Sequence, residues 1–157
     1  MKRSGFRKQS LEEIKTKQAI KRVKVVVKKV KKKVKTKTLA KWKKELDTVF
    51  SRYIRQRDQG QCFTCPKKDH WKSMQNGHFV PRQYLSLRFD ERNCNCQCYA
   101  CNMLYNGQPS LYAVNLKIKF GNSIVEELES VRLRETKLDA IWYGAKILHY
   151  QSLLEAE

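Results

Sequence analysis

Acidic residues and long apolar runs are both scarce in this chain. Its 157 residues include 15 Asp and Glu against 34 Lys and Arg, so the formal net charge is +19. Such an excess predicts a polyanionic partner, with nucleic acid as the first choice and an anionic membrane surface as the second. No run approaches the roughly 18 uncharged apolar residues of a membrane span. The sequence therefore predicts no segment that crosses a membrane.

The first residues, MKRSGFRKQSLEE, lack the apolar core of a secretory signal. We therefore expect a cytoplasmic protein. Because that compartment is reducing, we do not expect the six cysteines to form three disulfides. Hydrophobic residues make up 41% of the chain, which allows only a modest core. A small domain of this kind usually needs an additional constraint, such as disulfide bonds or a structural metal ion.

Two cysteine pairs have the spacing of metal ligands, Cys62 with Cys65 and Cys98 with Cys101. A Cys-x-x-Cys loop lets two thiolates converge on one ion about 2.3 Å away, and four thiolates leave no open position. The sequence therefore predicts a structural zinc site. Cys94 and Cys96 lie close enough to compete as ligands, but we prefer the second pair because a helix follows its loop. Cys94 and Cys96 then serve as small buried hydrophobes.

The positive charge is concentrated at the N-terminus, where residues 1–44 hold nineteen Lys and Arg but only two Glu. Valines and an isoleucine recur within this block at helical spacing, so residues 1–38 form a basic arm that is helical or disordered until DNA binds. The arm is expected to add nonspecific affinity through counterion release. Its predicted DNA-binding residues are Lys28, Lys29, Lys31, Lys32 and Lys33.

Residues 39–157 have the pattern of one small α+β domain. A helix is predicted over residues 39–57, from an apolar face opposite charged residues. The other expected elements are short strands at 75–80 and before Cys98, and helices at 99–105, 111–120, 123–133 and from about 136. In the last helix Leu138, Ile141, Ala145, Leu148 and Ser152 form a stripe that packs on the domain or on a second copy, which would give a homodimer.

The residues between and after the cysteine pairs resemble those of zinc-bound HNH endonucleases. The shared order is a first pair, a His near a Pro, an Asn five residues before the second pair, the second pair, and an Asn. A closer resemblance, from about Arg52 to Glu129, is to the NinG/Rap recombination proteins of lambda-like bacteriophages. The segments that carry it are RYIRQRD, CFTC, NGHF, LRFDERN, QCYACN and YAVNLKIKFG.

This resemblance implies a small ββα-metal domain, HNH-like or treble-clef-like, that is flanked by helices and cuts branched DNA such as Holliday junctions and D-loops. His78 would be the general base, because a water must lose a proton before it attacks phosphorus. Asn93 would orient the His78 ring, and Asn102 would ligate a catalytic Mg²⁺ or Mn²⁺.

The chain departs from the usual HNH pattern at Gly77, where most of these enzymes have an Asp that binds the metal. The best candidates to replace this Asp are Glu91 and Asp90 in the LRFDERN segment, with Asp69 as a distant third. Glu91 is our prediction for the acidic ligand of the catalytic cation.

Three arginines surround the predicted site among aromatic residues, a mixture that suits phosphate contact and stacking on unpaired bases. They are Arg82, Arg88 and Arg92. A solvated surface explains these residues nearly as well. The main alternative to an endonuclease is a non-catalytic zinc-finger DNA-binding protein, and a third is a structural role in which the arm binds RNA or an acidic protein.

Overall fold

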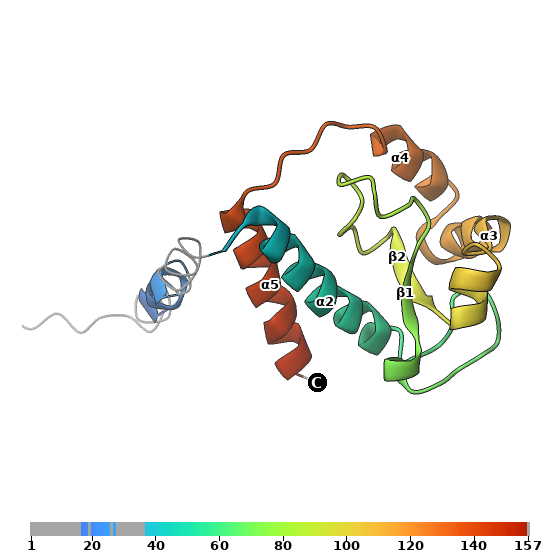
Figure 1. Cartoon of the computed structure of the whole chain (residues 1–157), viewed down its shortest axis with the longest axis horizontal. Coiled ribbons are helices and arrows are strands. Elements are labelled where there is room, and N and C mark those ends of the chain that lie inside the picture. Colours follow the sequence, from blue (N-terminus) through green and yellow to red (C-terminus); the bar gives the residue numbers. More distant parts are fainter. Residues whose placement is uncertain (1–16, 19, 26, 28–36, 157) are drawn as a thin grey trace, which may run out of the picture.

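The computed structural model describes residues 17, 18, 20–25, 27 and 37–156 (Figure 1). It combines helices with a two-stranded antiparallel sheet, so the predicted mixture of helix and strand is confirmed. Its elements are α2 (Leu39–Arg57), η1 (Trp71–Ser73), β1 (Gln75–His78), β2 (Cys94–Gln97), η2 (Ala100–Leu104), α3 (Pro109–Phe120), α4 (Ile124–Val131) and α5 (Ala140–Glu155).

The basic arm is described only in part. Its described residues between 17 and 27 are helical, and the side chains of Ile20, Val23 and Val27 are exposed. The five lysines predicted to bind DNA, at 28, 29 and 31–33, lie outside the described residues. Their role therefore stays a prediction.

Helix α2 has the predicted bounds and forms the main core with α5, which lies beside it (Figure 1). Thr38 caps the helix by accepting a hydrogen bond from the Lys41 amide, which satisfies one of the free donors of the first turn. The chain then turns away at Gly60, whose φ is +67°. A Cβ at this position would lie 1.8 Å from the Asp69 carbonyl oxygen, so only glycine fits.

The α2 core is rich in aromatic side chains. Four residues of α2 at helical spacing are buried there together with side chains from α5, the sheet and the loop between the strands. These buried residues are Trp42, Leu46, Phe50, Ile54, Phe89, Cys94, Tyr143, Ile147 and Tyr150. The core therefore joins the first helix of the domain to the last.

The sheet separates this core from a second one. His78 of β1 pairs with Cys94 of β2, and Gln75 pairs with Gln97. The second core includes Tyr112 of α3, whose hydroxyl donates to the carbonyl oxygen of Gly77 at 3.2 Å. The sheet is thereby fixed between α2 on one side and α3 on the other.

The last two helices differ from their predicted details. Helix α4 ends at Val131, and α5 begins after Asp139, whose side chain accepts from the Trp142 amide at 2.7 Å. In α5 the buried stripe is made of Tyr143, Gly144, Ile147 and Tyr150, whereas Ile141, Ala145 and Ser152 of the predicted stripe are exposed. Leu138 of that stripe does pack against the α2 core, but packing on the domain is wrong for the three exposed residues. Packing of the stripe on a second copy stays a prediction.

Candidate functional site

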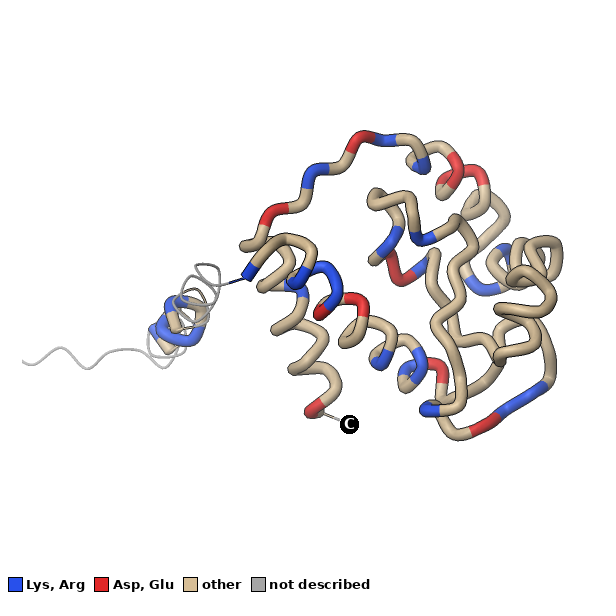
Figure 2. Tube along the Cα trace, in the orientation of Figure 1, with Lys and Arg blue, Asp and Glu red and all other residues tan. Residues whose placement is uncertain are grey.

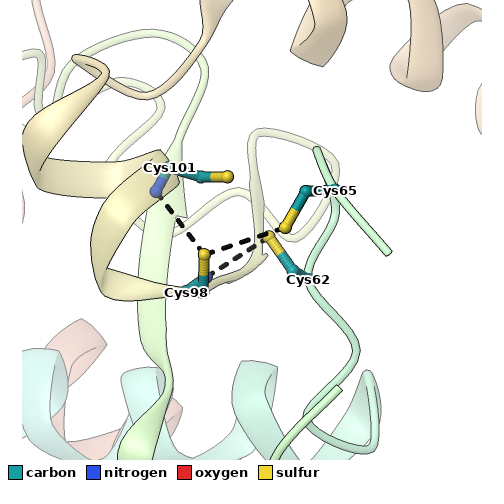
Figure 3. Close-up of side chains that lie close together, drawn as sticks. All are labelled: Cys62, Cys65, Cys98 and Cys101. Carbon is teal, nitrogen blue, oxygen red and sulfur yellow. Dashed lines mark hydrogen bonds between the residues drawn. The ribbon is translucent and has the colours of Figure 1, made fainter. Parts of the chain in front are cut away.

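Four cysteines converge at one end of the sheet, as Figure 3 shows. Cys62 and Cys65 come from the loop after α2, while Cys98 follows β2 and Cys101 lies in η2. Their sulfur atoms all lie within 4.8 Å of one another, and Cys65 Sγ is 3.8 Å from Cys98 Sγ. Four sulfurs placed tetrahedrally at about 2.3 Å from one zinc ion would be about 3.8 Å apart. The predicted ligand set therefore has the geometry of a metal site.

Backbone amides and one side chain hold these sulfurs in place. The Cys98 amide donates to Cys62 Sγ at 3.3 Å, and the Cys101 amide donates to Cys98 Sγ at 3.5 Å. The side-chain amide of Gln108 also donates to Cys101 Sγ, at 3.3 Å. Donors of this kind stabilise thiolates and orient them toward an ion.

The pKa values of two thiols in the cluster are shifted in opposite directions. Burial alone would raise the pKa of Cys62, but hydrogen bonds from Cys98 and Thr64 lower it to about 7. Burial raises the pKa of Cys65 to about 12, and the neighbouring cysteines add to this. Four adjacent thiolates repel one another unless a cation compensates their charge, so metal binding has to displace protons from this cluster.

The other two cysteines are buried outside this set. Cys94 is fully buried in the α2 core, where its thiol lies 3.7 Å from the Arg88 carbonyl oxygen. Cys96 packs beside the four cysteines without joining them. Both are fully buried, as expected of small hydrophobes.

A cavity of about 400 Å³ opens between α2 and β1, and its lining includes His78 and Asn102. Asp47, Arg55 and Arg88 also line it. Because Asn102 directly follows Cys101, the cysteine cluster fixes its place on η2. The structure thus brings together two of the residues that the HNH resemblance singles out.

His78 is partly buried at the end of β1, with Nε2 3.2 Å from the carbonyl oxygen of Arg88. Burial lowers the pKa of His78, and the charges of Arg82 and Arg88 act in the same direction, although the Arg88 carbonyl opposes them. A ring with a lowered pKa is neutral at pH 7 and able to accept a proton.

The two asparagines have different surroundings. Asn93 is fully buried and bonds the backbone of Val80 and Leu87, accepting from the Val80 amide at 2.7 Å. These bonds are made to the backbone of the loop and not to the His78 ring, so Asn93 braces the loop between the strands. Asn102 donates to the side-chain oxygen of Gln75 at 2.6 Å, at the edge of the His78 cavity.

Glu91 lines a different cavity, with Asp90 and Arg92. Its two carboxylate oxygens accept hydrogen bonds from the hydroxyls of Tyr53 and Tyr150, at 3.0 and 3.1 Å. The structure therefore does not bring Glu91 together with His78 and Asn102.

The three arginines predicted to bind DNA do not all lie at the His78 cavity. Arg82 is exposed and Arg88 is buried, and both line the His78 cavity. Arg92 is exposed elsewhere and pairs with Asp90 at 2.9 Å and with Glu127 at 3.3 Å. Figure 2 shows further basic residues along α2 and in the loop after it. Of the basic residues in the described domain, Arg55, Arg82 and Arg88 line the His78 cavity.

Several polar residues that line this cavity were not predicted from the sequence, among them Asp47 and Asn76. Asp47 comes from α2, far from His78 in sequence. Asn76 lies on β1, two residues before His78. The Asn76 side-chain oxygen is buried and accepts no hydrogen bond from the described residues. The sequence signal that could have identified Asp47 is the rarity of acidic residues in this basic chain. That rarity makes the carboxylate of Asp47, beside the apolar face of α2, conspicuous.

None of the helices in the described part of the chain has the length and apolar character that a bilayer crossing requires.

Comparisons with known proteins identify relatives of this chain. A family model described as the bacteriophage lambda NinG protein matches residues 1–156. Protein ninG of Escherichia phage 933W is 33% identical over 93 residues, which are 57% of this chain and 45% of that protein. Protein ninG of Salmonella phage P22 is also 33% identical, and that of Escherichia phage lambda 32%, each over 57% of this chain and 44% of theirs. The matched region thus spans less than half the length of these relatives. No solved structure shows a significant match.

Proposed function

The chain belongs to the NinG family of bacteriophage lambda, and from this premise we propose that it is a metal-dependent endonuclease that cuts branched DNA in phage recombination. The observation that carries the proposal is the cavity in which His78 and Asn102 lie together beside a four-cysteine cluster. This arrangement supports an HNH-like, ββα-metal interpretation of the sheet and η2. Holliday junctions and D-loops are the proposed substrates.

His78 acts as the general base in this proposal. If Nε2 carries the ring proton, it donates to the Arg88 carbonyl 3.2 Å away, and Nδ1 is left to accept a proton from water. The lowered pKa favours this neutral form at physiological pH. A base held in one tautomer is positioned to activate a water molecule for attack on a phosphodiester.

Arginines at the cavity supply the contacts to the phosphate. Arg82 is exposed at the cavity rim, where its guanidinium can reach a DNA backbone. Arg55 is held in the wall by bonds to the carbonyl oxygens of Ser51 and Trp71. Fixed positive charges of this kind position the DNA without reading its sequence. The basic arm and its lysines add a contact that depends strongly on salt.

The cavity also has oxygen donors that fit Mg²⁺ or Mn²⁺. Asn102 would hold the cation, and the buried Asn76 oxygen, which lacks a hydrogen-bond donor among the described residues, suits a cation or its hydration shell. A bound divalent cation supplies stabilisation of the charge that develops on the leaving oxygen. Glu91 is left out of this set because it lines a different cavity.

The four cysteines hold a structural zinc ion in this proposal. Their thiol groups complete a tetrahedral set with no open position, which is typical of structural rather than catalytic zinc. Because Cys101 and Asn102 are adjacent, the zinc would keep Asn102 facing the cavity.

Cleavage of a labelled four-way junction tests this function. Purified protein with Mg²⁺ or Mn²⁺ is expected to cut the junction in preference to plain duplex, and His78→Ala is expected to abolish cutting while zinc content and junction binding persist. His149→Ala is a matched control because His149 is exposed on α5, away from the cavity. Cutting by His78→Ala at the wild-type rate would overturn the role of His78. Junction binding by the purified wild type without any cutting would favour the non-catalytic zinc-finger protein.

Asn102→Ala tests the cation ligand separately. This change is expected to slow cleavage, with partial recovery at higher Mn²⁺ because mass action offsets a weakened ligand set. His78→Ala should show no such recovery, since added cation does not replace a base. Equal recovery in both variants would contradict the division of roles.

A further inference from the structure

Asp47 is the one carboxylate among the described residues that line the His78 cavity. It projects from the middle of α2, next to the buried Leu46, and its side chain is 30% exposed. The cavity therefore offers an acidic oxygen ligand on the same side as His78 and Asn102. Hard divalent cations prefer one or two carboxylates together with amide oxygens, water and phosphate.

The usual position for this carboxylate is closed in this chain. A Cβ on Gly77 would lie 2.0 Å from the side-chain oxygen of Gln97, which packs over the glycine. Gln97 is itself fully buried and held by bonds to Thr64 and to the Gly107 carbonyl oxygen. An acid for the cavity must therefore come from another element, and α2 is the element that provides one.

Arg88 neutralises Asp47 in the DNA-free protein. Its guanidinium donates twice to the Asp47 carboxylate, at 2.8 and 2.7 Å, and once to the Arg82 carbonyl oxygen at 2.7 Å. A bidentate, charge-assisted pair of this kind competes with a cation for the carboxylate. The side chain of Arg88 is only 11% exposed, so the pair is shielded from solvent on the arginine side.

The charges in the cavity disfavour a cation until DNA arrives. Arg55, Arg82 and Arg88 line it against the single carboxylate of Asp47. A phosphodiester brings negative charge and is itself a bidentate partner for a guanidinium. Once a phosphate bonds Arg88, the Asp47 carboxylate no longer has to compensate the arginine and becomes available to a cation.

We propose that Asp47 is the acidic ligand of the catalytic cation, and that Arg88 holds this carboxylate until a DNA phosphate takes its place. The inference rests on the proposed nuclease function and adds a residue and an order of binding to it. Cation and DNA then bind cooperatively, because each strengthens the other's site by the same factor.

Mn²⁺ binding measured by electron paramagnetic resonance tests the ligand directly. All proteins carry His78→Ala, so that the DNA stays intact. With a four-way junction present, Asp47→Asn is expected to weaken Mn²⁺ binding on the order of ten-fold or more. Glu45→Gln is the matched control, since it removes one negative charge from the same helix outside the cavity. Equal Mn²⁺ affinity in the two variants would overturn the inference.

A second measurement leaves Asp47 in place and so does not depend on folding of that variant. In the junction complex, Mn²⁺ should broaden the nuclear magnetic resonance signals of Asp47 and Asn102, and much less so without DNA. Broadening that spares Asp47, or that is equally strong without DNA, contradicts the proposal.

These outcomes separate the inference from the function. Junction cleavage by the wild type, with equal Mn²⁺ affinities in Asp47→Asn and Glu45→Gln, would leave the nuclease and remove the role of Asp47. DNA-dependent Mn²⁺ binding that requires Asp47, in a wild type that cuts no junction, would leave the cation site and remove the nuclease.

Discussion

Replacing Asn93 with alanine should destabilise the domain strongly, because its side chain bonds three buried backbone groups. The Val80 amide and carbonyl both lose their partner, whereas the Leu87 carbonyl keeps the Asp90 amide at 3.2 Å. Each buried group without a partner costs about 1–3 kcal/mol. Two such groups lower the free energy of unfolding by about 4 kcal/mol, and at about 4 °C for each kcal/mol the Tm falls by about 15 °C.

Thermal unfolding followed by circular dichroism, with zinc kept in excess, measures this change. Asn122→Ala is the matched control, because Asn122 is exposed in the turn before α4 and should shift stability by no more than about 0.5 kcal/mol. A Tm for Asn93→Ala within about 2 °C of the wild type would refute the bracing role. It would also return Asn93 to consideration as a residue that acts on His78 or on DNA.

Three further predictions concern the metal, the base and the arm. Cys62→Ser should release about one equivalent of zinc and unfold the domain, whereas Cys94→Ser should keep its zinc, as metal analysis would show. The nuclear magnetic resonance signal of the His78 ring should titrate below pH 6.5, because burial lowers the pKa of His78 in the folded protein. The unfolded chain then binds a proton at His78 more readily than the folded chain does. The stability that neutral His78 contributes is therefore lost as the pH falls below about 6.5. Deleting residues 1–36 spares the Thr38 cap of α2 and should weaken DNA binding and flatten its dependence on salt, while the preference for junctions survives. An unchanged salt dependence would show that the arm does not contact the DNA.

Local patterns in the sequence were sufficient for the parts of the fold that depend on neighbouring residues. The bounds of α2 follow from an apolar face that ends where Gly60 is required, and the cysteine cluster follows from two short loops. In α5 the same reasoning chose the wrong stripe. Both faces of that helix carry apolar residues, and the α2 core selects the one with Tyr143, Ile147 and Tyr150.

The composition of the His78 cavity could not be read from spacing. Asp47 reaches the cavity because α2 packs across the sheet. Its ion-pair partner there, Arg88, lies 41 residues further along the chain. Glu91 is closer to His78 in sequence, yet two tyrosine hydroxyls bind its carboxylate in another cavity. The sequence therefore did not indicate which carboxylate lines the His78 cavity.

The pairing of α2 with α5 has a consequence for the order in which the chain folds. About 80 residues separate these two helices, whereas the two cysteine pairs are separated by less than half that length. Closing a longer loop costs more chain entropy, and contacts distant in sequence form more slowly. During synthesis the cysteines and the sheet emerge before α5, so the part of the chain that contains the four cysteines can assemble while the aromatic face of α2 is still uncovered. Until Tyr143, Ile147 and Tyr150 arrive, that exposed face is the part of the folding intermediate most prone to aggregation.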